Sequence, residues 1–421
     1  MAVLPALTDL RLQQATLALR ACLNPESPAD VSLSRFFRDN PKLGGQDRHF
    51  VAEVVFAVLR SRLTLEALLP ESATPRRLLL AWLVKFNGTP IGSLEPFLQA
   101  KENRWLGEVK AAALEQLPLA ARAGLPAWVV EQLALPAEEI LALGRACQQA
   151  APLDLRVNTL KDQRQAALNT LAESGIQAQA TPYSPFGIRV AQKPALQQYP
   201  LFLQGHLEVQ DEGSQLLGLL LSPKRGEMVV DFCAGAGGKT LLLGMLMHST
   251  GRLYAFDVNE KRLHNFKPRL KRSGLSNVQT QLIAHENDTK IKRLAGKIDR
   301  VLVDAPCSGL GTLRRNPDLR WRQSADTVTQ LCAKQRTILA AAAKLLKVGG
   351  RLVYATCSLL PAENQAIIED FLANHPHFSL VPAQEILAQA HIPLEMGDYL
   401  QLSPAHHQTD GFFAAALTRV A

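Results

Sequence analysis

A glycine-rich turn between an apolar strand and a helix constrains the fold of this chain more than any other feature. The apolar residues 228–230 lead into the sequence Asp-Phe-Cys-Ala-Gly-Ala-Gly-Gly-Lys-Thr at 231–240. The glycines permit a tight turn and a close approach of the backbone to a ligand before a helix begins near Thr240. In open α/β sheets, ligands bind at the carboxyl edge of the strands. The stretch therefore predicts a loop that binds a nucleotide-like ligand at such an edge.

Predicted strands and helices alternate from this turn to the C-terminus. The expected strands are 228–230, 253–256, 278–283, 300–303 and 351–355, and the expected helices are 239–247, 260–273, 326–346 and 363–374. A further strand is expected at 412–417. This alternation predicts an α/β fold with a Rossmann-like doubly wound sheet.

The residues before the sheet divide into two regions of different character. Residues 7–145 have a helical pattern, and apolar residues at 50, 51, 54, 55, 58 and 59 form one stripe of a helix with Asp47 as its expected N-cap. Strands at 154–158 and 187–190 with a helix at 164–174 predict a small α/β segment next. We expect three parts: a helical domain at 1–150, the small α/β segment at 151–222 and the Rossmann-like domain at 223–421.

Composition limits the class of protein. The 421 residues are 47% hydrophobic, which suffices for a large core. No apolar run approaches the roughly 20 residues that span a bilayer, and the N-terminus lacks a basic region followed by a long apolar one. The six cysteines are scattered without metal-ligand spacing. We therefore expect a cytoplasmic protein with no membrane partner, no disulfide framework and no metal site.

Positive charge is concentrated in one stretch of the chain. The net charge is +8, and residues 252–322 contain sixteen Lys and Arg against seven Asp and Glu. A basic surface beside a cleft suits a nucleic acid, and Arg314, Arg315 and Arg322 are candidates for phosphate contacts. A solvated charged face explains the charge alone equally well.

The glycine-rich loop does not fit a phosphate ligand. Gly238-Lys239-Thr240 lacks the glycine five residues earlier that a P-loop requires. Asp231 at the strand end opposes a pyrophosphate, which needs backbone N–H groups free of negative charge. S-adenosylmethionine fits better, because its amino acid end can meet the loop, its ribose Asp257 and its adenine Asp288.

Two cysteines are expected just past the ends of neighbouring strands. Cys307 and Cys357 follow the apolar runs 301–303 and 352–354. Carbon 5 of a pyrimidine is a poor nucleophile until a thiolate adds at carbon 6, and a carboxyl group such as Asp304 near N3 favours that addition. A second group near the ring helps to remove the carbon 5 proton. Two thiols and an acid therefore suit pyrimidine C5 methylation, and on this reasoning either thiol can attack.

The other cysteines are expected to be structural. Cys22, Cys147 and Cys332 lie in helical patterns, and Cys233 lies inside the glycine-rich loop, where packing and loop shape account for it.

Several motifs in order resemble those of the RsmB/Sun (Fmu) family of RNA cytosine-C5 methyltransferases. They are the loop 231–240, Asp-Ala-Pro-Cys-Ser-Gly at 304–309, Gly-Thr-Leu-Arg-Arg-Asn-Pro-Asp at 311–318 with Trp321, and Tyr-Ala-Thr-Cys-Ser at 354–358. Arg156-x-Asn158 and residues 210–214 resemble the family's small RRM-like segment and its junction with the catalytic domain. The N-terminal helices loosely resemble the NusB-like RNA-binding domain of the bacterial rRNA enzyme.

The resemblance implies an enzyme that uses S-adenosylmethionine to methylate a flipped cytosine of RNA, most of all ribosomal RNA. It implies Cys357 as the nucleophile, Cys307 as the residue that assists product release, and Asp304 as their catalytic partner. It also assigns cofactor contacts to Cys233, Ala234, Gly235, Ala236, Gly237, Gly238, Lys239, Asp257, Asp288 and Asp304. Ala236 stands where many relatives have proline, which leaves the loop usable.

Two other functions fit these residues less well. An amine N-methyltransferase needs an aromatic residue after an Asp-Pro-Pro or Asn-Pro-Pro turn, and Cys307 stands there instead. A non-catalytic RNA-binding or ribosome-assembly factor has no need of Asp257, Asp304, Cys307 and Cys357 together.

Overall fold

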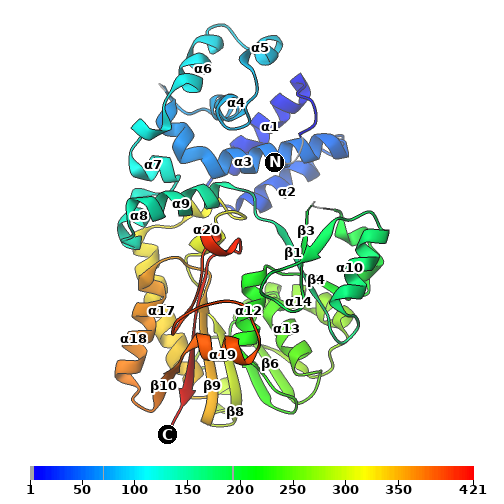
Figure 1. Ribbon diagram of the computed structural model, residues 1–421, viewed down its shortest axis with the longest axis vertical. Helices are drawn as coiled ribbons and strands as arrows, with labels where there is room; N and C mark the ends of the chain where they lie inside the picture. Colours follow the sequence, from blue (N-terminus) through cyan, green and yellow to red (C-terminus); the bar gives the residue numbers. More distant parts are fainter. Residues whose placement is uncertain (1–3, 70, 192–193) are drawn as a thin grey trace. The chain divides into compact units, whose positions relative to one another are not determined.

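The computed structural model describes residues 4–69, 71–191 and 194–421 (Figure 1). The chain forms two compact units. One combines Met1–Ala151 with Thr312–Ala325, and the other combines Pro152–Gly311 with Asp326–Ala421.

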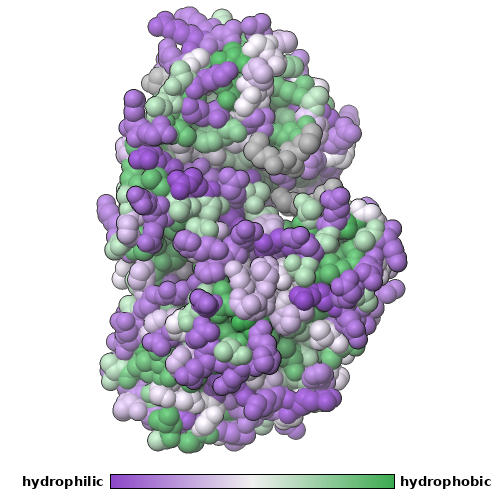
Figure 2. Space-filling model, in the orientation of Figure 1, coloured by the Kyte–Doolittle hydropathy of each residue, from purple (hydrophilic) through white to green (hydrophobic). Residues whose placement is uncertain are grey.

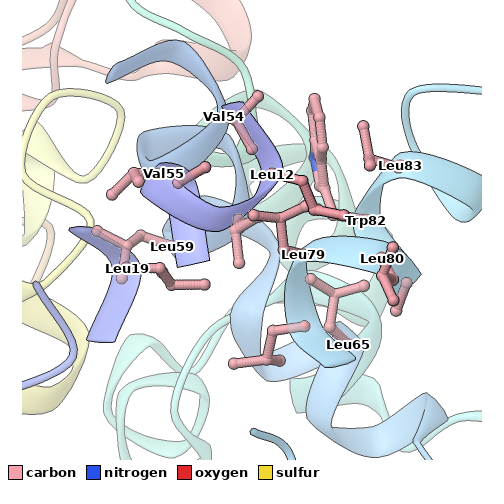
Figure 3. Close-up of a cluster of buried hydrophobic side chains, with 14 of the residues drawn as sticks. Leu12, Leu19, Val54, Val55, Leu59, Leu65, Leu79, Leu80, Trp82 and Leu83 are labelled. Atoms are coloured by element: carbon pink, nitrogen blue, oxygen red, sulfur yellow. The ribbon is translucent and has the colours of Figure 1, made fainter. Parts of the chain in front are cut away.

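The first unit is helical, as predicted for its N-terminal part. Its helices are α1 (Asp9–Cys22), α2 (Ala29–Asp39), α3 (Gly45–Leu68), α4 (Pro75–Lys85), α5 (Ile91–Leu94), α6 (Glu102–Ala111), α7 (Leu119–Ala123), α8 (Ala127–Leu133) and α9 (Ala137–Gln148). Apolar side chains of α1, α3 and α4 form its core, including Leu19, Val54, Leu59 and Leu79 (Figure 3). The predicted N-cap Asp47 is wrong, because α3 begins at Gly45 and the Asp47 carboxylate instead accepts a 2.8 Å hydrogen bond from Arg11.

A segment from the middle of the sequence belongs to this helical unit. Residues 312–325, which include α16 (Leu319–Arg322), pack there through the buried Arg320, whose guanidinium donates to the carbonyl of Gly124 at 2.7 Å. Arg60 donates to the carbonyl of Arg314, and Arg62 lies over the Trp321 ring. The side chain of Arg314 is buried, so the prediction that it contacts phosphate is wrong.

The second unit begins with a small antiparallel sheet in the order β2-β3-β1-β4. The strands are β1 (Leu153–Val157), β2 (Ala178–Ala180), β3 (Gly187–Val190) and β4 (Leu207–Val209), with helices α10 (Arg164–Glu173) and α11 (Pro200–Leu203). Leu155 of β1 and Ile188 of β3 are fully buried in its apolar core. The polar residues Asp154 and Arg156 of β1 are buried as well, so β1 is covered on both faces.

The large sheet has the order β10-β12-β9-β8-β5-β6-β7, with β11 paired to β12. Its strands are β5 (Met228–Asp231), β6 (Arg252–Asp257), β7 (Val278–Leu282), β8 (Ile298–Asp304), β9 (Leu346–Thr356), β10 (Phe378–Val381), β11 (Leu400–Leu402) and β12 (Phe412–Arg419). Strands β5 to β9 are parallel, and β12 is antiparallel to both β9 and β10.

Helices flank this sheet, with α17 and α18 on the left and α13 and α14 on the right in Figure 1. The helices of this region are α12 (Glu212–Leu221), α13 (Gly238–Leu246), α14 (Glu260–Ser273), α15 (Thr289–Lys292), α17 (Ala325–Ala343), α18 (Gln365–Asn374), α19 (Ala383–Gln389) and α20 (Pro404–His407). From β5 the chain runs outward through β6 and β7 and returns to β8 on the other side of β5. The predicted α/β Rossmann-like class is confirmed, and the switch between β5 and β8 is where such folds bind ligands.

Several predicted elements differ in their bounds, and the boundary between α17 and β9 differs most clearly. The helix predicted to reach residue 346 ends at Ala343, and Leu346 already pairs with Ile298 as the start of β9. Leu345 and Leu346 are buried, and they fit the apolar pattern of a helix as well as that of a strand. Hydrophobic periodicity therefore does not distinguish a helix from a strand at these two residues.

Hydrophilic residues predominate on the face drawn in Figure 2, and hydrophobic ones appear there in small scattered groups. Among the described helices, none is both long enough and apolar enough to cross a membrane.

Candidate active site

The carboxyl ends of four neighbouring parallel strands carry the predicted functional residues. Asp231 ends β5, Asp257 ends β6 and Asp304 ends β8, while Cys357 directly follows β9. The register pairs Asp304 with Ala355 and Asp231 with Leu302, so these ends lie at one edge of the sheet. The structure therefore brings together the residues that the sequence assigned to this edge.

The two thiols beyond β8 and β9 face each other. Cys307 Sγ lies 3.5 Å from Cys357 Sγ, and both residues are half-buried. The hydrogen bond with Cys357, followed by burial and by the charge of Cys357, raises the pKa of the Cys307 thiol well above its usual range. The sulfurs are close enough for adjacent carbons of one ring to meet both of them, and the protonation of the two thiols is linked.

An ion pair stands beside the thiols. Lys239 Nζ, from the first turn of α13, donates to Asp304 Oδ2 at 2.8 Å and lies over the Phe412 ring. Burial alone would lower the pKa of Lys239, but the charge of Asp304 and its hydrogen bond outweigh burial, and the pKa is raised. Lys239 is consequently a fixed positive charge next to the carboxylate and the two sulfurs.

The glycine-rich loop is shaped by hydrogen bonds to two strand-end acids. Asp257 Oδ2 accepts from the Gly235 N–H at 2.7 Å, and its Oδ1 accepts from the Asn259 N–H at 2.7 Å. The fully buried Asp231 accepts from the Thr240 hydroxyl at 2.6 Å, and burial raises the pKa of Asp231 to about 7. Each Asp257 oxygen keeps a lone pair for a ligand, because a carboxylate has about four acceptor sites.

The remaining loop residues are held from both sides. The Ala234 N–H donates to the carbonyl of Phe256, and the Ala236 carbonyl accepts from Arg269 of α14. Cys233 is half-buried, and burial above all raises the pKa of its thiol well above the usual range, in keeping with a packing role. Gly238 begins α13, so its N–H is one of those that the first turn leaves unpaired.

Asp288 has a local structural task. Its carboxylate accepts from the backbone N–H groups of Ala284 and Lys290, both at 2.9 Å, and caps α15. These hydrogen bonds lower the pKa of Asp288. The side chain follows β7, and its contact with adenine stays a prediction.

The structure adds residues that the sequence did not indicate. Val258 follows Asp257 and is 55% exposed, although a valine at a strand end is usually covered. Its place next to a strand-end acid could have drawn attention to it as an apolar surface for a ring. Glu363 is buried and contacts Ser308 and Ser358, the residues that directly follow the two thiols.

The other cysteines lie where the sequence placed them. Cys22, Cys147 and Cys332 are buried within α1, α9 and α17. Over the described residues, no group of three or more His, Cys, Asp or Glu side chains is arranged to hold a metal ion.

A family model and a relative that match this chain are both described as ribosomal RNA methyltransferases. Residues 218–418 match the model of the family described as 16S rRNA methyltransferase RsmB/F, and residues 125–197 match that of the RsmF/B-like ferredoxin-like domain. A relative from Synechocystis, named "Probable ribosomal RNA small subunit methyltransferase B", is 33% identical over 97% of this chain and 99% of its own length.

Two solved structures share the fold over most of the chain. "Crystal Structure of PH0851" has a TM-score of 0.79 and 25% identity, and covers 99% of this chain and all of its own. A methyltransferase homolog from Pyrococcus horikoshii has a TM-score of 0.62 and 29% identity over 73% of this chain and all of its own.

Proposed function

Because the chain belongs to the 16S rRNA methyltransferase RsmB/F family, we propose that it methylates carbon 5 of a cytosine in ribosomal RNA through a covalent adduct with Cys357. The observation that carries this proposal is the pair of thiols 3.5 Å apart at the ends of adjacent strands, with Asp304 and Lys239 beside them. Such an arrangement suits a reaction in which one sulfur activates a ring and the other helps to release it.

The first step activates the base. The Cys357 thiolate adds to carbon 6 of a cytosine turned out of its stack, and the electrons of the broken C5–C6 double bond pass toward carbon 5 and the N3 edge. We assign the contact with N3 to Asp304, and the Lys239 ammonium, 2.8 Å from the Asp304 carboxylate, offsets the negative charge that develops on the ring. Carbon 5 then takes the methyl group.

The residues at the glycine-rich loop fit S-adenosylmethionine as the methyl donor. Donor contacts are assigned to residues 233–239, Asp257 and Asp288, and Asp257 retains acceptor capacity for ribose hydroxyls. A Cβ added at Gly235 would meet nothing within 4 Å, so a ligand can approach the backbone there. When bound, the donor supplies an electrophilic methyl group, and the protein's part is to orient it toward carbon 5.

The second step releases the product, and the linked thiols explain how Cys307 becomes able to act. The raised pKa of Cys307 comes first from its hydrogen bond with Cys357 and also from the charge of Cys357. Once Cys357 is a thioether, both contributions disappear and the pKa of Cys307 falls. The Cys307 thiolate then takes the carbon 5 proton, the bond between Cys357 and carbon 6 breaks, and Cys357 leaves as a thiolate.

Replacement of each thiol tests this division of labour. Cys357→Ala should abolish methylation and the adduct, because the ring is never activated. Cys307→Ala should accumulate a denaturant-resistant complex with RNA, because methyl transfer occurs but release stalls. Denaturing gels of both variants with RNA and donor show the result, and a trapped complex from Cys357→Ala alone would reverse the assignment.

We also propose the division into parts at 1–150, 151–222 and 223–421, except that residues 312–325 belong to the helical part, and we propose that the helical part is an RNA-binding domain. A ribosomal RNA substrate favours the cytoplasm as the protein's location. Binding of rRNA fragments to chains with and without substitutions in the helical part would test its role.

A further inference from the structure

A buried carboxylate lies beneath the two thiols. Glu363 ends the short 3₁₀ helix Pro361–Glu363, and its side chain is fully buried. Its Oε1 accepts from the Ser308 N–H at 2.9 Å and from Gln335 Nε2 at 3.0 Å. Its Oε2 contacts the hydroxyls of both Ser308, at 2.5 Å, and Ser358.

Both serines stand directly after a thiol. Ser308 follows Cys307, and Ser358 follows Cys357. The Ser358 hydroxyl accepts from the Leu360 N–H at 3.1 Å, so its own proton is free to point at Glu363. Four donors therefore converge on this carboxylate, two on each of its oxygens.

Further hydrogen bonds hold the segments that surround the Glu363 carboxylate. Gln335 of α17 also donates to the Pro306 carbonyl at 3.0 Å, on the other side of Cys307. The Tyr354 hydroxyl, from β9, donates to the Glu363 carbonyl at 2.7 Å. Asn364 donates to the Ser358 carbonyl at 3.1 Å, on the far side of Cys357. Hydrogen bonds that involve Glu363, Asn364 or Gln335 therefore hold each loop at a residue next to its thiol.

We propose that Glu363 is a positioning residue that ties the Cys307 loop to the Cys357 loop and thereby sets the separation of the two sulfurs. The proposal rests on the proposed function for its catalytic consequence, because both thiols must reach one ring. A buried carboxylate is costly to retain, and three of its four hydrogen bonds come from the serines that directly follow the thiols, while the fourth comes from Gln335 of α17. An acid with a purely structural task would have no need to join these two loops.

Glu363→Gln is the sharpest substitution, because it keeps the shape and replaces an acceptor by a donor. Each carboxylate oxygen accepts from two donors, so the new amide N–H₂ faces two donors on one side, and both of those hydrogen bonds are perturbed without a cavity. Glu369→Gln, on the exposed side of α18, is the matched control. In the Cys307→Ala background, Glu363→Gln should slow formation of the RNA complex by about 10- to 100-fold, the effect of misplacing a reacting group by about 1 Å.

Donor affinity separates this role from general damage to the fold. It should be unchanged in Cys307→Ala/Glu363→Gln, and kcat rather than KM should fall when Glu363→Gln is made alone. Ser358→Ala removes one hydrogen bond to Glu363 and leaves the carboxylate itself in place, so it should also slow complex formation, but by less. If Glu363→Gln does not fold, Ser358→Ala provides the test of the positioning role. Complex formation at the Cys307→Ala rate in both variants would overturn the proposal.

A second assay is independent of the proposed chemistry. A short dibromo reagent bridges two thiols only when they are adjacent, so it reports the separation of Cys307 and Cys357 without RNA or donor. Bridging should be slower in Glu363→Gln than in Glu369→Gln. If Cys307→Ala alone forms no complex, the proposed division of labour fails, whereas unchanged bridging in Glu363→Gln refutes the positioning role itself.

Discussion

Two glycines of the glycine-rich loop offer a direct test of how α14 shapes this loop. Gly235 and Gly237 both have positive φ, at 55° and 83°. A Cβ added at Gly235 would meet nothing within 4 Å, whereas one at Gly237 would lie 2.0 Å from the Phe266 ring of α14. Gly235→Ala therefore carries the backbone strain alone, and Gly237→Ala carries the strain together with a steric clash.

The expected costs follow from this difference. Alanine in the left-handed region costs about 1–2 kcal/mol, so this is the expected loss of unfolding free energy for Gly235→Ala. Overpacking a well-filled site adds about 1–3 kcal/mol, which brings Gly237→Ala to roughly 2–5 kcal/mol. Phe266 is fully buried, so its ring cannot turn away into solvent. Gly237→Ala should also weaken donor binding, because relief of the clash moves the loop.

The assay can read each unit separately. All five tyrosines lie in the unit that contains the loop, and all four tryptophans lie in the helical unit. Urea unfolding followed by tyrosine absorbance should show the loss in Gly237→Ala, while tryptophan fluorescence provides the internal control. In a Phe266→Ala background the extra cost of Gly237→Ala should shrink, since the clashing ring is gone. Equal losses for Gly235→Ala and Gly237→Ala would refute the role assigned to Phe266.

Three further experiments test the electrostatics. Asp257→Ala should weaken donor binding by about 10- to 100-fold, the worth of one or two hydrogen bonds to a charged group; unchanged affinity in calorimetry would remove Asp257 from the site. Cys357→Ala should lower the pKa of Cys307, because it removes the main causes of its elevation, so alkylation of Cys307 should begin at lower pH than in the wild type; an unchanged pH profile would show that the thiols are not linked. Glutamine in place of the exposed α14 lysines Lys261, Lys267 and Lys271 should flatten the salt dependence of rRNA binding, since fewer counterions are released. A salt dependence with the same slope as in the wild type would show that these lysines form a solvated charged face and do not contact RNA phosphates.

Local pattern was enough to predict the strand-end residues. Asp257, Cys307 and Cys357 each follow a short apolar run, and a parallel sheet places the ends of such runs at one edge. The bounds predicted for α14 agree with the structure because its apolar period and its flanking Asn259 and Gly274 are signals within one segment. The choice between the thiols had to come from family resemblance, since both have the same local setting.

The sequence by itself determined the α/β class, the alternation of elements and the residues at the sheet edge, because periodicity and capping act over a few residues. Tertiary structure decided what depends on partners far along the chain. Arg320 is buried because it binds the carbonyl of Gly124, and this contact carries residues 312–325 into the helical unit. Glu363 matters through Ser308, 55 residues away. Hydrogen bonds and packing between such distant residues leave no local pattern, so only the folded chain shows them.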